Sequence, residues 1–535
     1  MVRSYYPLIL IFSSYLRPAW LGFSLYLVIA GAAFAALLGY ASPSSWGQYF
    51  ADPYTWRVVR FSLLQASLSA LLSILLAIPM ASCLFHRRFL GRQTLLSLFA
   101  ISMVVPTIVA ILGIVVVYGR SGWFTSVFGV SFPLYGLGGI LLAHVFFNMP
   151  LAVRVILQAY SLIPDAQWRL ASQLGLSRWH VFQLIEWHYL RKNLPGVFLL
   201  IFMLCFSGFA VVLSLGGGPR SSTLEVAIYQ ALRFEFDLNK ASYLSLLQVL
   251  ICSLVALAVY RFAPSVRQDV SLYQGERLRL PSSWWANLAD FSALAVVLLW
   301  VLPPFAAILV PIFSALFWQT LGMEDLWWSL WHSVRIALPS GLLALGIGLS
   351  IAALARALRW RQETDAWAQR LEQSGNLVLM VPSLVLATGL FLLFRNLGVS
   401  IKHAYWIVVW VNAVMALPFV LRALMPTIYQ QEKRFRHLYA QMNITGWARL
   451  RLEWGQIRSA AAQGLAYAVL LSLGDLGVVA LFGSKGLETL PMYLFQLIGS
   501  YRVEQGACVA VVLILLCLML FYVINRLVGG RRAVV

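Results

Sequence analysis

The residues of this chain that could do chemistry are few, and none of them falls into a known catalytic pattern. No phosphate-binding loop of the form GxxxxGKS or GxxxxGKT occurs, and the glycines of GGGPR (216–220) are not followed by Lys-Ser or Lys-Thr. There is no GxSxG motif. The histidines and cysteines form no HExxH motif and no CxxC pair; they are His86, His144, His180, His188, His332, His403, His437, Cys83, Cys205, Cys252, Cys508 and Cys517. The sequence therefore predicts no catalytic residue, no metal site and no cofactor bound by this chain.

Asp475 is the one acidic residue that stands well inside an apolar stretch, LSLGDLGVVALFG (471–483). An ionisable group inside a membrane is costly, so its presence is a functional hypothesis. Asp475 could face a transport pathway and attract a cationic substrate. It could instead satisfy helix termini or polar groups beside Gly474 and Gly477. The sequence leaves both roles open.

The composition places these residues in a membrane protein. Of the 535 residues, 61% are hydrophobic and only 11% are charged, whereas a soluble domain carries about 25% charged residues. The mean hydropathy is +0.82. We expect an all-α polytopic fold of about twelve transmembrane helices, at 19–40, 57–83, 94–118, 136–159, 196–215, 243–262, 290–317, 329–354, 376–395, 404–424, 461–482 and 507–528.

The net charge of +20 is explained by topology rather than by nucleic-acid binding. With the N-terminus in the cytoplasm, most Lys and Arg residues fall into inner loops, and an even helix count returns the C-terminus to the same side. The apolar run 21–38 is interpreted as an uncleaved first helix. Several tryptophans stand near predicted span ends, as in an interfacial belt: Trp46, Trp56, Trp123, Trp327 and Trp328.

The chain is a tandem repeat. LASQLGLSRWHVFQLIEW (170–187) matches LYAQMNITGWARLRLEW (438–454), NMPLAVR (148–154) matches MALPFVLR (415–422), and AVVLSLGG (210–217) matches GVVALFGS (477–484). Asp475 corresponds to Gly208. We predict two parallel six-helix repeats at 1–262 and 290–535, joined by a cytoplasmic linker at 263–289, with the transport path at the seam between them.

Each half carries a long polar loop after its fourth helix, at about 162–194 and 425–460. Pro164 and Asp165 suit the first turn of a helix, and Gly175 permits a backbone turn that other residues resist. Ala171 and Gly175 stand four apart, so a helix reaching that far would present a small-residue face to a partner. A second short amphipathic segment follows through Trp179.

This loop pattern resembles the EAA loop of ATP-binding-cassette (ABC) importer permeases, and the resemblance covers nearly the whole chain. It is similar to the fused double permeases for thiamine and for ferric iron. WRVVRFSLLQASLSALLS (56–73), YGLGGILLAHVFFNMPLA (135–152) and LGDLGVVALFG (473–483) look most like the thiamine permeases. The resemblance implies ATPase coupling at Ala171, Gly175, Trp179, Glu186, Tyr439, Asn443, Trp447 and Glu453.

The same resemblance implies the partners and the location. These are two copies of an ABC ATPase that uses ATP and Mg, a periplasmic substrate-binding protein, and a bacterial inner membrane in which the chain moves thiamine by alternating access. The second loop departs from the pattern, because Asn443 replaces the motif glycine and the loop is one residue shorter before Glu453. Asn tolerates a left-handed backbone, so the turn can persist.

Two alternatives remain. A ferric-iron or other small-solute ABC permease would have the same composition, because a separate protein selects the substrate. An ion-coupled secondary transporter can also have six plus six helices, and HRRFLGR (86–92) is similar to a basic loop in such carriers. Proton coupling usually needs several intramembrane ionisable groups, and this chain offers little beyond Asp475.

Overall fold

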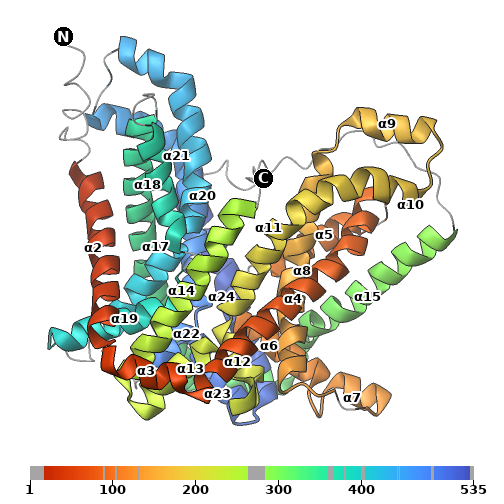
Figure 1. Cartoon of the computed structure of the whole chain (residues 1–535), viewed down its shortest axis with the longest axis horizontal. Coiled ribbons are helices and arrows are strands. Elements are labelled where there is room, and N and C mark those ends of the chain that lie inside the picture. The colour runs from red at the N-terminus through yellow and green to blue at the C-terminus, as the bar shows by residue number, and fades with distance from the viewer. Residues whose placement is uncertain are drawn as a thin grey trace.

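A computed structural model describes residues 17–41, 43–87, 89, 91–102, 105–130, 132–262, 284–359, 365–378, 381–398, 404–442, 444, 446–482 and 487–529. All regular structure in these residues is helical. Ten of the helices are long and apolar enough to cross a membrane. The expected all-α polytopic fold is confirmed (Figure 1).

The first half begins with a long helix and then alternates long and short helices. Its elements are α2 (Arg17–Tyr40), α3 (Pro43–Ala51), α4 (Pro53–His86), α5 (Arg92–Ser102), α6 (Thr107–Tyr118), α7 (Trp123–Phe128), α8 (Leu137–Ser161), α9 (Asp165–Gln173), α10 (Arg178–Val181), the π-helix η1 (Phe182–Glu186), α11 (Trp187–Phe206), α12 (Phe209–Leu215), the 3-10 turn η2 (Pro219–Ser221), α13 (Leu224–Gln230), the π-helix η3 (Ala231–Glu235) and α14 (Leu238–Phe262).

The second half repeats this order with fewer interruptions. Its elements are α15 (Trp284–Leu309), the 3-10 turn η4 (Val310–Phe313), α16 (Ala315–Leu321), α17 (Glu324–Arg359), α18 (Asp365–Leu377), α19 (Ser383–Asn396), α20 (Ala404–Gln441), α21 (Gly446–Leu473), α22 (Gly477–Phe482), α23 (Leu490–Gly499) and α24 (Val503–Gly529). Of the predicted linker 263–289, residues 284–289 belong to α15, and residues 263–283 lie outside the described residues.

The repeat extends to individual hydrogen bonds. The backbone N–H of Leu224, at the start of α13, donates to Ser62 Oγ of α4 at 3.0 Å. At the corresponding place in the second half, the N–H of Leu490 donates to Ser333 Oγ of α17 at 2.8 Å. Each bond satisfies one of the first N–H groups of a short helix, which have no acceptor within the helix. The tandem duplication therefore preserved local packing as well as helix order.

Four predicted spans are broken, and the prediction of continuous helices there was wrong. The spans 94–118 and 376–395 are interrupted before Pro106 and Pro382, each of which is the N-cap of the following helix. The spans 196–215 and 461–482 are interrupted at 207–208 and 474–476. Proline lacks the N–H that a helix interior needs, and glycine weakens helices. The breaks fall at matching places in the two halves.

The first helix of each half packs against the other half. Helix α2 lies on α17 and α19, and α15 lies on α4 and α6. Glycine permits the close approach in both cases. A Cβ built on Gly113 of α6 would lie 2.5 Å from the carbonyl oxygen of Pro304, and one built on Gly389 of α19 would lie 2.6 Å from that of Ala33. This reciprocal exchange holds the two halves together.

The molecule has two different ends. Helices α3, α7, α13 and α23 lie together at the lower end of Figure 1, called here the α13 end. Helices α9 and α10 lie at the opposite end, called here the α9 end, where the ribbons of the two halves diverge. The five tryptophans expected in an interfacial belt are all exposed.

The glycine contact between the halves generates a prediction about stability. Replacing Gly389 by Ala should lower the melting temperature of the purified protein, because the new methyl group would lie 2.6 Å from the backbone carbonyl oxygen of Ala33 and the two helices would have to shift apart. Overpacking of this kind costs about 1–3 kcal/mol. Gly346→Ala is the matched control, since a Cβ there meets nothing within 4 Å. Equal melting temperatures for the two variants would contradict the close approach.

Candidate functional site

The loop of the first half folds into a short helix with a defined turn at each end. Pro164 separates α8 from α9, because a proline ring blocks the helix from continuing through it. Asp165 occupies the first turn of α9, as expected. After α9, Gly175 adopts a left-handed backbone with φ of +59°, and the N–H of Leu176 donates to the carbonyl of Ala171 at 3.1 Å. This is the hydrogen bond of a glycine-terminated helix.

The loop of the second half keeps the helix-ending hydrogen bond but not the break before the helix. Glu432 stands where the first half has Pro164, so α20 continues unbroken to Gln441. The N–H of Ile444 donates to the carbonyl of Tyr439 at 2.9 Å, which is the counterpart of the bond from Leu176 to Ala171. Asn443 lies outside the described residues. That the turn survives without the glycine therefore stays a prediction.

The proposed small-residue face is not formed. Ala171 is 1% exposed and packs into the protein, and Gly175 lies beyond the end of α9. The corresponding Tyr439 is 6% exposed. Trp179, by contrast, is exposed at the start of α10 and stacks on Phe182 with ring centroids 5.8 Å apart. Trp447 lies in the first turn of α21.

An exposed apolar pair is present in both loops instead, and the sequence analysis missed it. Leu170 and Leu174 are exposed in the first half, and their counterparts Leu438 and Met442 are exposed in the second. Exposed apolar groups that recur at matching positions mark a contact surface better than single ones do. The signal was present in the sequence as two apolar residues, four apart, at matching positions of the two loops.

Glu186 is the buried anchor of the first loop. The residue is 0% exposed, and its Oε1 lies 2.6 Å from Nε2 of His86 at the end of α4. Phe85 and Trp168 pack beside the imidazole. Because Trp168 belongs to α9 and His86 to α4, this cluster ties the loop to a long membrane helix.

Glu453 is the corresponding anchor of the second loop, but its partners are guanidinium groups. Its two oxygens lie 2.6 Å from Arg356 of α17 and 2.7 Å from Arg449 of α21. Arg449 also pairs with the buried Glu432 of α20. Both loops are therefore fixed by a buried carboxylate, with an imidazole in one half and two permanent cations in the other.

Asp290 connects the first loop to the second half of the chain. It lies near the start of α15 and accepts hydrogen bonds from Arg87, at 2.7 Å, and from Arg178 of α10. These bonds connect α10 to α15, the helix of the second half that packs on the first half. Nothing in the local sequence indicated this contact, because the partners are far apart in the chain.

Asp475 lies in the break between α21 and α22. Its carboxylate faces the N–H groups of Gly477, Val478 and Val479 and the side chain of Asn412. It therefore caps the short helix α22. Its Oδ2 is buried without a hydrogen-bond partner. Across the described residues, no group of three or more His, Cys, Asp or Glu could hold a metal ion.

Two related helical halves with matching loops at one end describe a membrane permease. A family model described as "Binding-protein-dependent transport system inner membrane component" matches residues 70–268. The chain is 44% identical over 528 residues to the thiamine transport system permease protein ThiP of Escherichia coli (strain K12), covering 96% of this chain and 98% of that protein.

Two further relatives with the same printed name are also similar over nearly their whole length. The protein of Brucella abortus (strain 2308) is 39% identical over 517 residues, and that of Haemophilus influenzae (strain ATCC 51907 / DSM 11121 / KW20 / Rd) is 37% identical over 516 residues. In each comparison 94% of both chains is covered. The chain belongs to the family of binding-protein-dependent permeases, as a multi-pass inner membrane component that is not itself an enzyme.

The two buried anchors should respond differently to neutralisation. Glu453→Gln leaves two guanidinium groups with one buried carboxylate, Glu432, and a guanidinium does not lose its charge. Glu186→Gln leaves an imidazole, which can become neutral. We expect Glu453→Gln to cost about 3–5 kcal/mol and Glu186→Gln clearly less. Melting temperatures of the purified variants test this, and an equal or reversed order would contradict it.

Proposed function

We propose that this chain is the translocation subunit of an ATP-driven importer of thiamine and its phosphate esters. The observation that carries the proposal is the similarity of 44% identity over 96% of the chain to a thiamine permease, including both loops and the seam. The sequence contains no phosphate-binding loop, so a separate subunit would hydrolyse the ATP.

Two copies of an ABC ATPase, using ATP and Mg, are the proposed partners at the α9 end. Three features support two equivalent docking places: the paired exposed side chains, the shared helix-ending hydrogen bond, and the buried carboxylate that fixes each loop. A periplasmic substrate-binding protein is the proposed partner at the α13 end. With the loops facing the cytoplasm, both chain termini lie on that side, as the distribution of Lys and Arg favours.

The contacts suggest how movement at the loops would reach the seam. A force on α9 or α10 passes to α4 through Trp168 and His86, and to α15 through Arg178 and Asp290. In the second half it passes from α20 and α21 to α17 through Glu453 and Arg356. The halves diverge at the α9 end in Figure 1, so approach of the two loops would close that end. Alternating access needs two such states, each preferred by a different ligand.

Reconstituted transport tests the proposed substrate. The chain, a candidate ABC ATPase and a candidate periplasmic binding protein are placed in proteoliposomes with ATP, and uptake of labelled thiamine is compared with uptake of ferric iron. We expect ATP-dependent accumulation of thiamine and none of iron. Uptake of iron without thiamine would overturn the substrate assignment, and uptake driven by an ion gradient without ATP would overturn the class.

Charge substitutions at the exposed apolar pairs test the docking places. Leu170→Asp and Leu438→Asp should each reduce co-purification of the ATPase at least several-fold, because a carboxylate would be buried in an apolar contact. Both side chains are exposed in the isolated chain, so folding should be preserved. Leu397→Asp, at an exposed leucine after α19, is the control. Normal co-purification by both loop variants would contradict the assignment.

A further inference from the structure

A second buried carboxylate, which the sequence analysis did not single out, lies close to Asp475. Glu225 belongs to the short helix α13 and is 1% exposed. Its Oε1 accepts a hydrogen bond from Gln248 Nε2 of α14 at 3.4 Å, and the N–H of Phe209 at the start of α12 also interacts with the carboxylate. Its Oε2 is buried without a hydrogen-bond partner. Glu225 therefore stands at the N-terminus of α12 as Asp475 stands at that of α22.

The two carboxylates come from different halves and repel each other. Asp475 acts electrostatically on Glu225, and a Cβ built on Gly477 would lie 3.8 Å from Oδ1 of Asp475 and 3.3 Å from the ring of Phe209, whose N–H faces Glu225. Among the described residues, neither carboxyl group forms a salt bridge with a Lys, Arg or His side chain. A buried negative charge without a cation is costly. At Glu186 and Glu453, by contrast, the chain supplies a basic side chain as the partner, His86 in one half and Arg356 in the other. A cation that enters from outside the chain would supply the positive partner that Glu225 and Asp475 lack.

Neighbouring polar groups also have unused hydrogen-bonding capacity. Gln248 is 0% exposed. Its Nε2 donates to Glu225, and its Oε1 has no hydrogen-bond partner. Nε2 of His144, 3% exposed, has no partner and would lie 2.6 Å from a Cβ built on Gly208. Buried polar groups are almost always paired in proteins. Their concentration here indicates a ligand with polar groups of its own.

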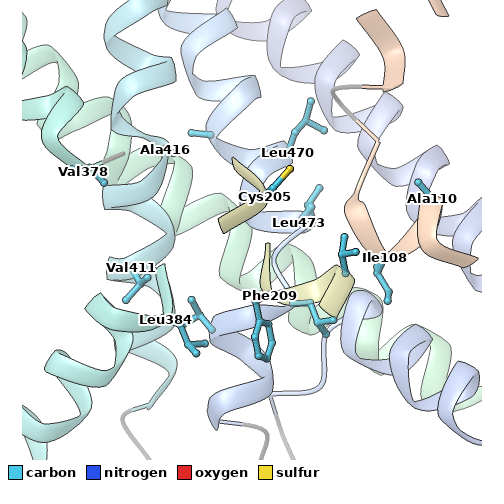
Figure 2. Close-up of a cluster of buried hydrophobic side chains, with 14 of the residues drawn as sticks. Ile108, Ala110, Cys205, Phe209, Val378, Leu384, Val411, Ala416, Leu470 and Leu473 are labelled. Carbon is cyan, nitrogen blue, oxygen red and sulfur yellow. The ribbon is translucent and has the colours of Figure 1, made fainter. Parts of the chain in front are cut away.

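An aromatic ring completes the surroundings. Phe209 packs edge-on against Tyr229 of α13 with centroids 5.4 Å apart, and its ring reaches to 3.3 Å of a Cβ built on Gly477. Figure 2 shows Phe209 in the cluster that Ile108, Leu384, Val411 and Leu473 contribute from both halves. An aromatic face beside carboxylates suits a flat organic cation.

We propose that Glu225 and Asp475 act as one acidic pair, contributed by both halves, that binds the positively charged heteroaromatic ring of the substrate at the seam. The inference rests on the proposed function, because thiamine carries a permanently charged thiazolium ring. The amide of Gln248 and the ring of Phe209 would orient this cation between the two carboxylates.

The two acids occupy positions that the repeat does not relate. The counterpart of Asp475 is Gly208, and the counterpart of Glu225 is Pro491, as the equivalent bonds at Leu224 and Leu490 establish. A pathway with two equivalent halves would offer a substrate two equivalent orientations. Acids at non-equivalent positions remove this ambiguity of orientation. An asymmetric cation then has one defined binding mode.

A purely structural role for the acids predicts different behaviour. If Glu225 and Asp475 only cap α12 and α22, Gln and Asn variants keep a hydrogen-bond acceptor of nearly the same shape, and loss of charge should affect all ligands equally. Charge recognition instead predicts an effect confined to cationic ligands.

The test uses equilibrium binding to the purified full-length chain, without the binding protein, so that only the permease site is measured. Labelled thiamine is compared with its neutral thiophene isostere in the unchanged chain, Glu225→Gln and Asp475→Asn. Glu504→Gln is the control, because Glu504 is an exposed acid in the first turn of α24. We expect each site variant to weaken thiamine binding about ten-fold or more and to leave isostere binding unchanged.

Equal losses for thiamine and the isostere, unchanged thiamine binding in both variants, or no thiamine binding to the unchanged chain would each overturn the inference. A sodium-dependent melting temperature that both variants abolish, with thiamine binding unchanged, would assign the pair to an inorganic cation and also overturn it. If Glu225→Gln does not fold, Asp475→Asn decides. Uptake in the complete system tests the proposed function separately, since thiamine uptake without charge-dependent binding would leave that function intact.

Discussion

Every backbone N–H and C=O inside a bilayer must find its partner within the protein, since hydrocarbon offers none. Much of this structure follows from that constraint. The chain crosses the membrane in helices, and where a helix breaks, the freed groups are enclosed by protein. The breaks before α12 and α22 lie at the seam, where Glu225 and Asp475 face N–H groups that have no acceptor within their helix. The interruptions thus create polar, positively polarised helix ends in the middle of an apolar cluster.

The exchanged helices α2 and α15 join the two halves of the chain. Helix α2 rests on the second half and α15 on the first, with a glycine at each closest approach. At the α13 end the halves are in contact through α13, α19, α23 and α6. Toward the α9 end the ribbons of the two halves diverge in Figure 1, and there Asp290 of α15 joins them through Arg87 and Arg178.

The two loops show how a duplicated element diverges while its chemistry is kept. A proline separates α9 from α8, whereas a glutamate at the same place lets α20 run on and adds Glu432 to an ionic cluster. One buried carboxylate has an imidazole partner and the other has two guanidinium groups. The exposed apolar pair and the helix-ending hydrogen bond are the same in both loops. The two loops therefore keep the same exposed side chains, whereas the residues that hold each loop on the neighbouring helices differ.

The sequence by itself determined the membrane class, the tandem repeat, the position of both loops and the absence of phosphate-binding chemistry, because these follow from composition, periodicity and short motifs. It also located Asp475 and the glycine turn. Only the tertiary structure decided that Ala171 is buried, that four spans are broken, and that the first helices are exchanged. It alone brought Glu225 beside Asp475 and Asp290 beside Arg178. These outcomes depend on contacts between residues far apart in the chain, and a local pattern carries no record of which distant helix will supply a side chain's partner.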